Sequence, residues 1–436
     1  MRPARLRAAV GALALLAVSL AAACTDQAAR NVGPADPTGS NPAASPAYPT
    51  ADSDPTAEPD PTAEPDPTAE PDPKPEPERR TVSLRVAGDV LLHVKTGQTA
   101  RADACRRGAS GLDFEPMLAG VAPAVRGADL AFCHLETPLA PPQGPFADYP
   151  AFSVPPQVVP ALRRAGFDAC TTASNHSLDR GADGLARTLD TLDARGIDHD
   201  GTARTAQEQR RTMVLDADGV RVAVLSYTFG TNGIALPAGQ PWAVSLIDPA
   251  RIAREAAAAR RGGADVVAVG LHAGTEYVTA PDDYQTALVD EITRSPDIDV
   301  VYGHHAHVPQ PIDRVHGTWV AYGLGNFVAG QQTAVRLTYR GVSVRFELTE
   351  RPGRSRGAGG RFAVTDIGYL PTAITGADPA RPTTRVLDIR AALDDPDTPR
   401  RLLPRLRADL AAVRADVLSR GADTLDPDVD VHLLRR

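Results

Sequence analysis

The chain has 436 residues, 42% of them hydrophobic, and a formal net charge of −8 at pH 7. This length and apolar content suffice for one large or two ordinary domains with a full hydrophobic core. Ten acidic and three basic residues between positions 51 and 80 account for seven of the eight net negative charges, so the rest of the chain is nearly neutral. No basic patch or nucleic-acid-binding motif stands out, and we expect no nucleic-acid partner.

Residues 1–23 have the layout of a secretory signal peptide. Three arginines within the first seven residues precede an apolar run at 8–22, which is too short for a comfortable membrane-spanning helix. The segment 20–24, Leu-Ala-Ala-Ala-Cys, is similar to a bacterial lipoprotein cleavage box, in which Cys24 would carry the lipid. The alternative is ordinary cleavage near Ala23. Both predict an extracytoplasmic protein, either held at the outer face of the cell membrane by a lipid anchor or secreted.

Residues 24–80 are predicted to form a disordered stalk rich in Pro, Asp and Glu. Positions 54–71 are three copies of Asp-Pro-Thr-Ala-Glu-Pro, a composition from which no hydrophobic core can form. Proline and charge repulsion favour extended segments of roughly 3 Å per residue, so this stalk could hold a folded domain on the order of 100 Å from its anchor.

Besides Cys24 the chain has three cysteines, Cys105, Cys133 and Cys170. An odd number allows at most one disulfide among the three, so the fold does not depend on a disulfide framework. We expect at least one of them to be a buried free thiol.

From residue 81 onward, strand-like and helix-like segments alternate. Apolar runs at 81–87, 128–132, 167–171, 219–227, 264–270 and 298–302 are separated by segments with helical character, among them 155–165, 185–194, 249–261 and 282–294. This alternation predicts a layered α/β domain, in which ligands bind beyond the carboxyl ends of the strands. Five runs are followed by potential ligands, and only 219–227 is interpreted as purely structural. These polar residues are Asp89, Glu136, Asn175 with His176, His272, and His305 with His307.

The segment Gly303–Gln310 contains three of the ten histidines within four positions. In an extended segment, residues two positions apart point the same way, so His305 and His307 would face one point and His304 would face elsewhere. This spacing predicts a pair of metal ligands at the end of a strand.

The pattern changes after residue 335. Strand-like runs at 336–339, 342–348, 362–369 and 385–389 are expected to extend a second sheet, with a mobile hairpin loop at 351–360. An amphipathic helix at about 399–420 is expected to pack on the domain surface without a chemical role. We therefore divide the folded part into a domain at 81–390 and a C-terminal helical extension at 391–436.

Six motifs together resemble the bacterial capsule-synthesis protein CapA family, which has the calcineurin-like metallophosphatase fold. The resemblance covers about residues 81–328 and implies a four-layer α/β/β/α sandwich with a metal site at one sheet edge. It also implies a link to extracellular poly-γ-glutamate or a related anionic capsule polymer. The motifs are Gly88-Asp89, Leu135–Leu139, Ser174–His176 with Leu178–Gly181, His272–Tyr277, Gly303–Gln310 and Tyr322–Val328.

The resemblance implies one or two divalent ions. Oxygen and nitrogen donors without thiolate suit manganese, zinc, iron or magnesium and do not choose among them. The sequence departs from the superfamily pattern at one ligand position. The superfamily has Asp-X-His, but this chain has Asp89-Val90-Leu91, so one histidine ligand is missing and one metal site is in doubt. His93 is a possible substitute for that histidine. The implied ligands are Asp89, Glu136, Asn175, His272, His305 and His307.

The resemblance also implies roles around the metals. His176 matches the catalytic histidine, and Asp179 would either fix its tautomer or cap the helix that begins near 181. Glu276 would act as a base or contact substrate, or else form a loop hydrogen bond. Four further residues are expected to line the substrate site: His134, Tyr277, His304 and Asn326. For Asn326, a role in a turn is the simpler interpretation.

Three functions remain open at this point. The first is a metal-dependent hydrolase or transferase that acts on an anionic polymer or peptide-like substrate. The second is a non-catalytic, polymer-binding accessory subunit of a membrane synthase, to which the lost Asp-X-His histidine points. The third is a metal-dependent peptide epimerase.

Overall fold

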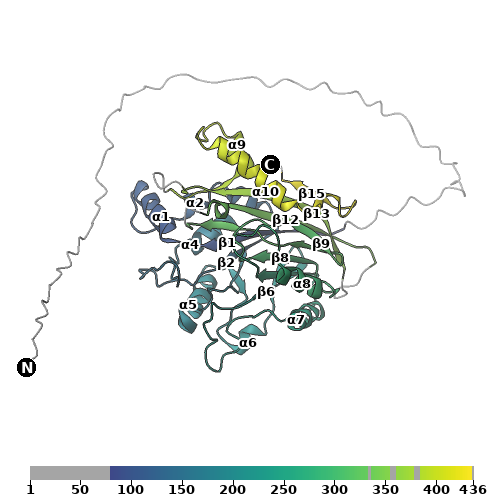
Figure 1. Cartoon of the computed structure of the whole chain (residues 1–436). Coiled ribbons are helices and arrows are strands. Elements are labelled where there is room, and N and C mark those ends of the chain that lie inside the picture. Colours follow the sequence, from purple (N-terminus) through teal and green to yellow (C-terminus); the bar gives the residue numbers. More distant parts are fainter. Residues whose placement is uncertain (1–78, 332–334, 354–359, 378–382, 435–436) are drawn as a thin grey trace, which may run out of the picture. The chain divides into compact units, whose positions relative to one another are not determined.

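Two β-sheets form the centre of the fold in the computed structural model, which describes residues 79–331, 335–353, 360–377 and 383–434 (Figure 1). The predicted signal peptide, the lipidation site Cys24 and all but the last two residues of the predicted stalk lie outside these residues. Within the described ranges, no helix has the length and apolar character needed to cross a bilayer.

The first sheet has nine strands in the described part of the chain. Its order is β14-β13-β12-β1-β2-β3-β4, and β11 and β15 pair with β1 and β13. The strands are β1 (Thr81–Leu91), β2 (Leu130–Leu135), β3 (Ala169–Thr171), β4 (Asp198–Asp200), β11 (Asn326–Ala329), β12 (Arg340–Glu350), β13 (Phe362–Ile374), β14 (Val386–Asp388) and β15 (Asp430–Leu433).

The second sheet has six strands among the described residues, in the order β5-β6-β7-β8-β10-β9. Its central pairs β6·β7, β7·β8 and β8·β10 are parallel, as the alternation of helices and strands predicts. The strands are β5 (Met213–Ala217), β6 (Val220–Thr228), β7 (Val266–His272), β8 (Val300–His304), β9 (Ile312–Val315) and β10 (Thr318–Ala321).

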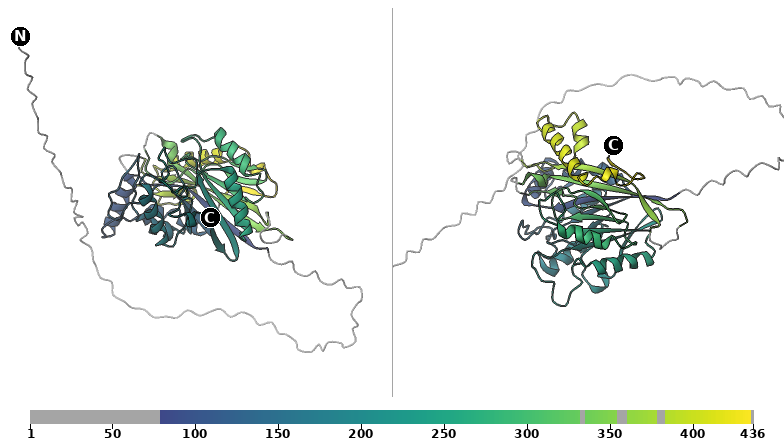
Figure 2. Two further views of the ribbon diagram at one scale, coloured as in Figure 1. Left: turned by 90° about the horizontal axis from the view of Figure 1, so that it is seen from below. Right: turned by 45° about the vertical axis from the view of Figure 1, so that its right-hand side comes forward.

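Helices cover the outer faces of both sheets. Figures 1 and 2 show α9 and α10 lying over β12 and β13, and α7 and α8 lie against the second sheet. The helices are α1 (Val94–Arg106), α2 (Glu115–Leu118), α3 (Ala122–Arg126), α4 (Val158–Ala165), α5 (Gly181–Asp193), α6 (Ala206–Gln209), α7 (Pro249–Arg261), α8 (Asp283–Ile292), α9 (Ile389–Asp394) and α10 (Leu403–Val417), with 3₁₀ turns η1 (Arg336–Tyr339) and η2 (Ala422–Thr424).

The hydrophobic core between the sheets confirms the four-layer prediction. Alternate residues of β1, such as Leu84 and Val86, pack with Val224 of β6 and Tyr302 of β8, all nearly inaccessible to water. Period-two alternation places these side chains on one face of β1 and directs their neighbours to the helix-covered face. Separate clusters fill the spaces between each sheet and its helices, so the fold is an α/β/β/α sandwich.

The structure corrects several expectations for the C-terminal half. The segment 336–339 is a 3₁₀ turn and not a strand. The strands β12 and β13 form the expected hairpin, but they join the sheet that contains β1. The extension after 391 is not all helical, because β15 adds a parallel strand beside β13. Residues 354–359 of the expected mobile loop lie outside the described part of the chain.

A disulfide joins Cys133 to Cys170, which lie opposite each other in the neighbouring parallel strands β2 and β3. No cysteine in the described ranges is a free thiol. The expectation of a buried free thiol is therefore wrong. Its basis was the number of cysteines, and a count leaves open which cysteines meet in the folded chain.

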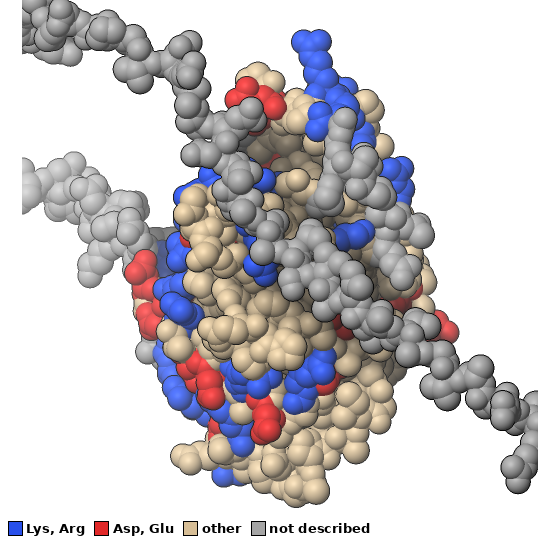
Figure 3. Space-filling model, turned by 90° about the vertical axis from the view of Figure 1, so that its left-hand side faces the viewer, with Lys and Arg blue, Asp and Glu red and all other residues tan. Residues whose placement is uncertain are grey.

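Glu350, the last residue of β12, forms ion pairs with two arginines. Its carboxylate accepts hydrogen bonds from Arg80 (2.9 Å) and Arg361 (2.5 Å). The pairing with Arg80, and then with Arg361, lowers the pKa of Glu350 to about 2 from 4.5. Elsewhere, Figure 3 shows a face on which basic and acidic side chains lie side by side.

We expect Glu350→Gln to destabilise the protein by roughly 0.2–1 kcal/mol at pH 7, the usual range for exposed ion pairs. The pKa is depressed in the folded state, so the stabilisation is complete above pH 4.5 and is lost as the pH falls toward about 2. Urea unfolding at pH 7 and at pH 3.5 measures this. An equal difference between wild type and variant at both values would show that the charge is not responsible.

Candidate metal centre

The carboxyl ends of strands from both sheets meet at one edge of the sandwich. β1 and β2 are parallel and place Asp89 opposite His134, whereas β7 and β8 are parallel and place His272 opposite His304. All four side chains are at least 98% buried. The strand-end residues that the sequence singles out are therefore brought together, because parallel strands end at the same edge.

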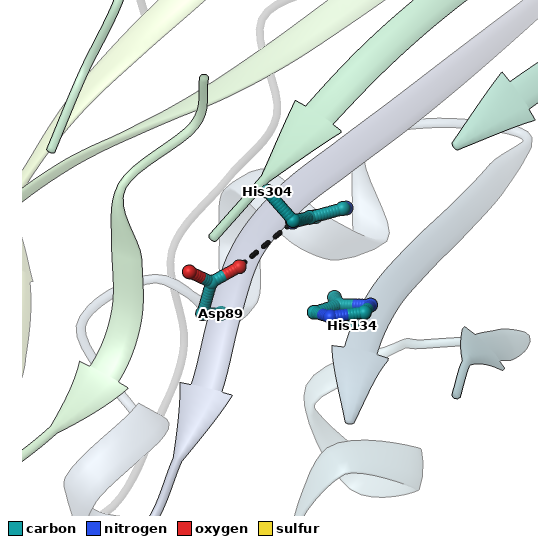
Figure 4. A group of neighbouring side chains, drawn as sticks. All are labelled: Asp89, His134 and His304. Atoms are coloured by element: carbon teal, nitrogen blue, oxygen red, sulfur yellow. Dashed lines mark hydrogen bonds and ion pairs between the residues drawn. The ribbon is translucent and has the colours of Figure 1, made fainter. Parts of the chain in front are cut away.

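Asp89 is the centre of the first group. Its Oδ1 accepts a hydrogen bond from Nδ1 of His304 (2.8 Å), and its Oδ2 lies 3.0 Å from Nδ1 of His307. Figure 4 shows His304 directed at Asp89, with His134 beside them. Burial alone would raise the pKa of Asp89, but the hydrogen bonds from the two histidines outweigh it and hold this pKa well below its usual value.

Glu136 is the least satisfied group of the site. It is 1% exposed, and neither of its carboxylate oxygens has a hydrogen-bond partner. Its Oε1 lies 3.8 Å from Nε2 of His307 and 4.0 Å from Nε2 of His272. Burial raises the pKa of Glu136 to about 7. Asp89, Glu136 and His307 each offer a ligand atom, and these three atoms lie within 4.8 Å of one another.

A chain of hydrogen bonds positions His272. Its Nε2 lies 2.9 Å from Oδ1 of Asn175, and its Nδ1 lies 2.9 Å from Nε2 of His134. The other ring nitrogen of His134 contacts Oγ1 of Thr171, also at 2.9 Å. Such a partner on the second ring nitrogen fixes the tautomer of a metal-ligating histidine. Held by Asn175 and His134, the ring of His272 presents its Nε2 4.0 Å from Oε1 of Glu136.

His134 and His304 differ from the expectation that they line the substrate site. Their rings stack with centroids 4.1 Å apart, and both are buried. Both nitrogens of His134 are occupied by protein groups, whereas Nε2 of His304 has no partner. Asp89, His134 and His304 form a second group of potential ligand atoms within 4.8 Å. These contacts favour an orienting or ligating role over substrate contact.

The loop after β8 is not extended, which corrects the geometry assumed for the histidine pair. His305 and His307 have φ angles of 87° and 57°, left-handed conformations that non-glycine residues rarely adopt outside functional sites. The two side chains still converge, because both lie with Glu276 in a third group within 4.8 Å. Glu276 itself is exposed, and Tyr277 beside it is 38% exposed with a φ of 66°.

The charges of these two histidines differ. Burial lowers the pKa of His305 to about 4, so this ring is neutral. Burial also opposes the charged form of His307, but the carboxylates of Glu136 and Asp89 outweigh it and raise its pKa to about 9. A histidine ring must be neutral to bind a metal ion, so cation binding between Glu136 and His307 would displace the proton from His307.

Asp179 holds His176 and does not cap a helix. Its Oδ2 lies 2.8 Å from Nδ1 of His176 and accepts a hydrogen bond from the backbone N–H of Phe152 (2.8 Å). The N-cap of α5 is Arg180, without a side-chain cap, so of the two roles left open for Asp179 the structure favours the tautomer-fixing one. Burial would lower the pKa of His176, but Asp179 and Glu136 raise it above 6.5.

Asn326 contributes to the site from β11. It is fully buried, its Oδ1 lies 3.1 Å from Nδ1 of His307, and its amide donates to the carbonyl of Thr338 (2.9 Å). This contact favours orientation of His307 over a turn role. His93 contacts the carbonyl of Leu91 (3.0 Å) and is in none of the ligand groups formed by the described residues. Its Nδ1 also accepts from the backbone N–H of Gly330 (3.1 Å), and its role as a substitute for the missing histidine stays a prediction.

Two residues near the site have no sequence prediction. The side-chain oxygen Oδ1 of Asn232 accepts a hydrogen bond from Asn175 (3.2 Å), and its amide nitrogen lies 3.5 Å from Nδ1 of His176. Phe229 is 45% exposed, with its ring 4.7 Å from that of His305. Both follow β6, whose run 219–227 we interpreted as structural. The polar Thr-Asn-Gly sequence just after it was the available signal.

Comparison with known proteins extends these observations. Relatives include the capsule biosynthesis protein CapA of Bacillus anthracis, 32% identical over 40% of this chain and 43% of that protein. The PGA biosynthesis protein CapA of Bacillus subtilis is 30% identical over 48% of this chain and 53% of that protein. This chain thus spans about half the length of these relatives.

Among solved structures, the calcineurin-like phosphoesterase YfkN of Bacillus subtilis is similar at 15% identity, covering 77% of this chain and 100% of that chain, with a TM-score of 0.39. The sequence profile described as bacterial capsule synthesis protein PGA_cap matches residues 83–331, more than half of the chain and every predicted ligand. The chain therefore belongs to the bacterial capsule synthesis protein family PGA_cap.

Proposed function

We propose that this protein is a metal-dependent hydrolase or transferase that acts on an acidic capsule or envelope polymer, poly-γ-glutamate or a related peptide-like chain. The observation that carries the catalytic part is Glu136, a fully buried carboxylate with no hydrogen-bond partner between two histidine nitrogens. Even with the protonated His307 3.8 Å away, burial raises the pKa of Glu136 to about 7, so its charged form is costly unless a further cation is present. Family membership and the name of the Bacillus subtilis relative support the polymer.

The residues fit a divalent metal. Asp89, Glu136 and His307 would hold one ion, and Asn175 and His272 would hold a second, with His305 nearby. Bound metal of this kind lowers the pKa of water and polarises the bond under attack. The oxygen and nitrogen donors fit manganese, zinc, iron or magnesium.

The chain's own acid is His176. Asp179 occupies its Nδ1, which leaves Nε2 to face a substrate. Because its pKa is raised, the ring is more protonated at neutral pH than a free histidine and can donate to a leaving group. Tyr277 and Glu276, on the exposed rim, would contact the substrate.

The location and partners are part of the proposal. The amino-terminal sequence supports an extracytoplasmic protein held at the membrane by lipid on Cys24, with the proline-rich stalk as a spacer. An anchored protein of this kind would meet its polymer beside a membrane synthase.

One observation favours an accessory, polymer-binding role instead. Leu91 stands where the wider superfamily has a histidine, and it is 2% exposed within the hydrophobic core. Retention of full capsule assembly by a His176→Ala strain would support this role and contradict the catalytic one.

The direct test is metal content. We expect the full chain, purified with manganese, zinc and iron supplied, to contain about two equivalents by mass spectrometry. The double variant His305→Ala, His307→Ala should lose them, and the exposed control His316→Ala should not. Folded wild-type protein without metal would overturn the catalytic proposal.

A further inference from the structure

A cavity of about 850 Å³ lies on the helix-covered face of the first sheet, apart from the metal centre. Its lining includes Arg85 from β1 and Arg345 from β12, with residues of α3 and α9 around them. The ligand groups at the sheet edge contribute no residue to this lining.

The two arginines form a cross-strand pair of like charges. Arg85 lies directly opposite Arg345 in the antiparallel register of β1 and β12. Like charges at directly opposed positions destabilise a sheet. A pair of this kind inside a cavity points to a compensating negative charge.

The protein places little negative charge next to Arg85. This residue is 3% exposed, forms no ion pair within the described chain, and donates only to Oγ of Ser343 (3.3 Å), while its Nε has no partner. A guanidinium offers five N–H donors, so most of its capacity is unused. Burial and Arg345 lower the pKa of Arg85 to about 10, which leaves it charged at neutral pH.

The nearby carboxylates are committed elsewhere or lie at the rim. Arg345 donates to Asp366 (2.9 Å) and lies 3.9 Å from the carboxylate of Glu347, but its Nε is buried without a partner. Asp388 accepts the backbone N–H groups of Arg390 and Ala391 at the start of α9. Asp394 and Asp395 are exposed. None of these carboxylates forms an ion pair with Arg85, and the charge of Asp388 raises the pKa of Arg85 by less than burial and Arg345 lower it.

We propose that this cavity is a second binding site, specific for a small oxyanion, and that Arg85 and Arg345 hold the phosphate or carboxylate group between them. A guanidinium group binds a planar carboxylate or a tetrahedral phosphate through two parallel hydrogen bonds. The site would be independent of metal and would respond to free phosphate or to a dicarboxylate of about the length of a glutamyl side chain.

Calorimetric titration of the full chain tests this. The protein is first treated with chelator, so that no metal can hold the anion, and is titrated at constant ionic strength with inorganic phosphate in one arm and glutarate in the other. We expect saturable binding of at least one anion. Arg85→Met, which keeps the side-chain volume, should weaken it at least about tenfold.

Arg345→Met is the second variant and should weaken binding to the same extent. It serves as the test if Arg85→Met does not fold. Arg294→Met is the matched control, because Arg294 follows the end of α8, its side chain is 63% exposed, and among the described residues it pairs only with Asp290. A preference for phosphate or for glutarate identifies the source of the oxyanion. The proposal is overturned if neither anion binds, or if wild type and the folded arginine variants bind equally well.

Discussion

Glu136→Gln is expected to abolish the stabilisation that divalent metal gives to this protein. Metal at about a thousand times its Kd should stabilise the wild type by about 4 kcal/mol. For a chain of this size, the midpoint of thermal unfolding would rise by about 5 °C. The variant lacks the carboxylate that lies between His272 and His307 and should show almost no rise.

The same substitution should have the opposite effect in metal-free protein. Without a metal ion, the wild type buries a carboxylate that has no hydrogen-bond partner. The pKa of Glu136 is raised to about 7 from 4.5, so stability is lost as the pH rises through this interval. With chelator at pH 8, Glu136→Gln is therefore expected to be more stable than wild type by about 1–3 kcal/mol.

Thermal unfolding with chelator and with each metal measures both effects. Glu291→Gln is the control, because Glu291 is exposed on α8. It should follow the wild type under every condition. Equal stabilisation of Glu136→Gln and wild type by metal would place the metal elsewhere and contradict the site described here.

His176→Ala is expected to lower the turnover number by about 10²–10⁴, the usual contribution of a general acid or base. Metal content should not change, because His176 is hydrogen-bonded to Asp179 and belongs to no group of potential metal ligands among the described residues. Asp179→Asn keeps the shape but weakens control of the tautomer, so a smaller loss of about 10–100-fold is expected.

The measurement is turnover on phosphoesters and γ-glutamyl peptides together with metal analysis of each variant. In the wild type, the rate should fall as the pH rises past the raised pKa of His176, and this limb should be absent in His176→Ala. Exposed His316→Ala serves as control. Unchanged turnover in His176→Ala would exclude the proposed acid.

The ligands at the strand ends could be predicted from the sequence, because their placement requires only the order of strands and helices along the chain. Apolar runs followed by Asp89, Glu136, Asn175 and His272 predict a shared edge wherever the strands are parallel. The prediction needs the order of elements but not their exact register. The same holds for the four layers, which follow from the alternation of helices and strands.

Pairings between distant residues could not be predicted in this way. The contact of His304 with Asp89, the bond of Cys133 to Cys170 and the opposition of Arg85 to Arg345 depend on strand order and register. These are fixed by packing across the whole domain. The left-handed turn at His305 likewise reverses the simple alternation of an extended strand.

The sequence by itself determined the fold class, the family and which residues reach the edge of the sandwich, because periodicity and motif order are local properties of the chain. Only the tertiary structure decided which of these residues face one another. It gave His134 and Asn326 orienting contacts, tied Asp179 to His176 and left Glu136 without a partner. The physical reason is that hydrogen bonding and burial at this edge arise between segments up to 218 residues apart.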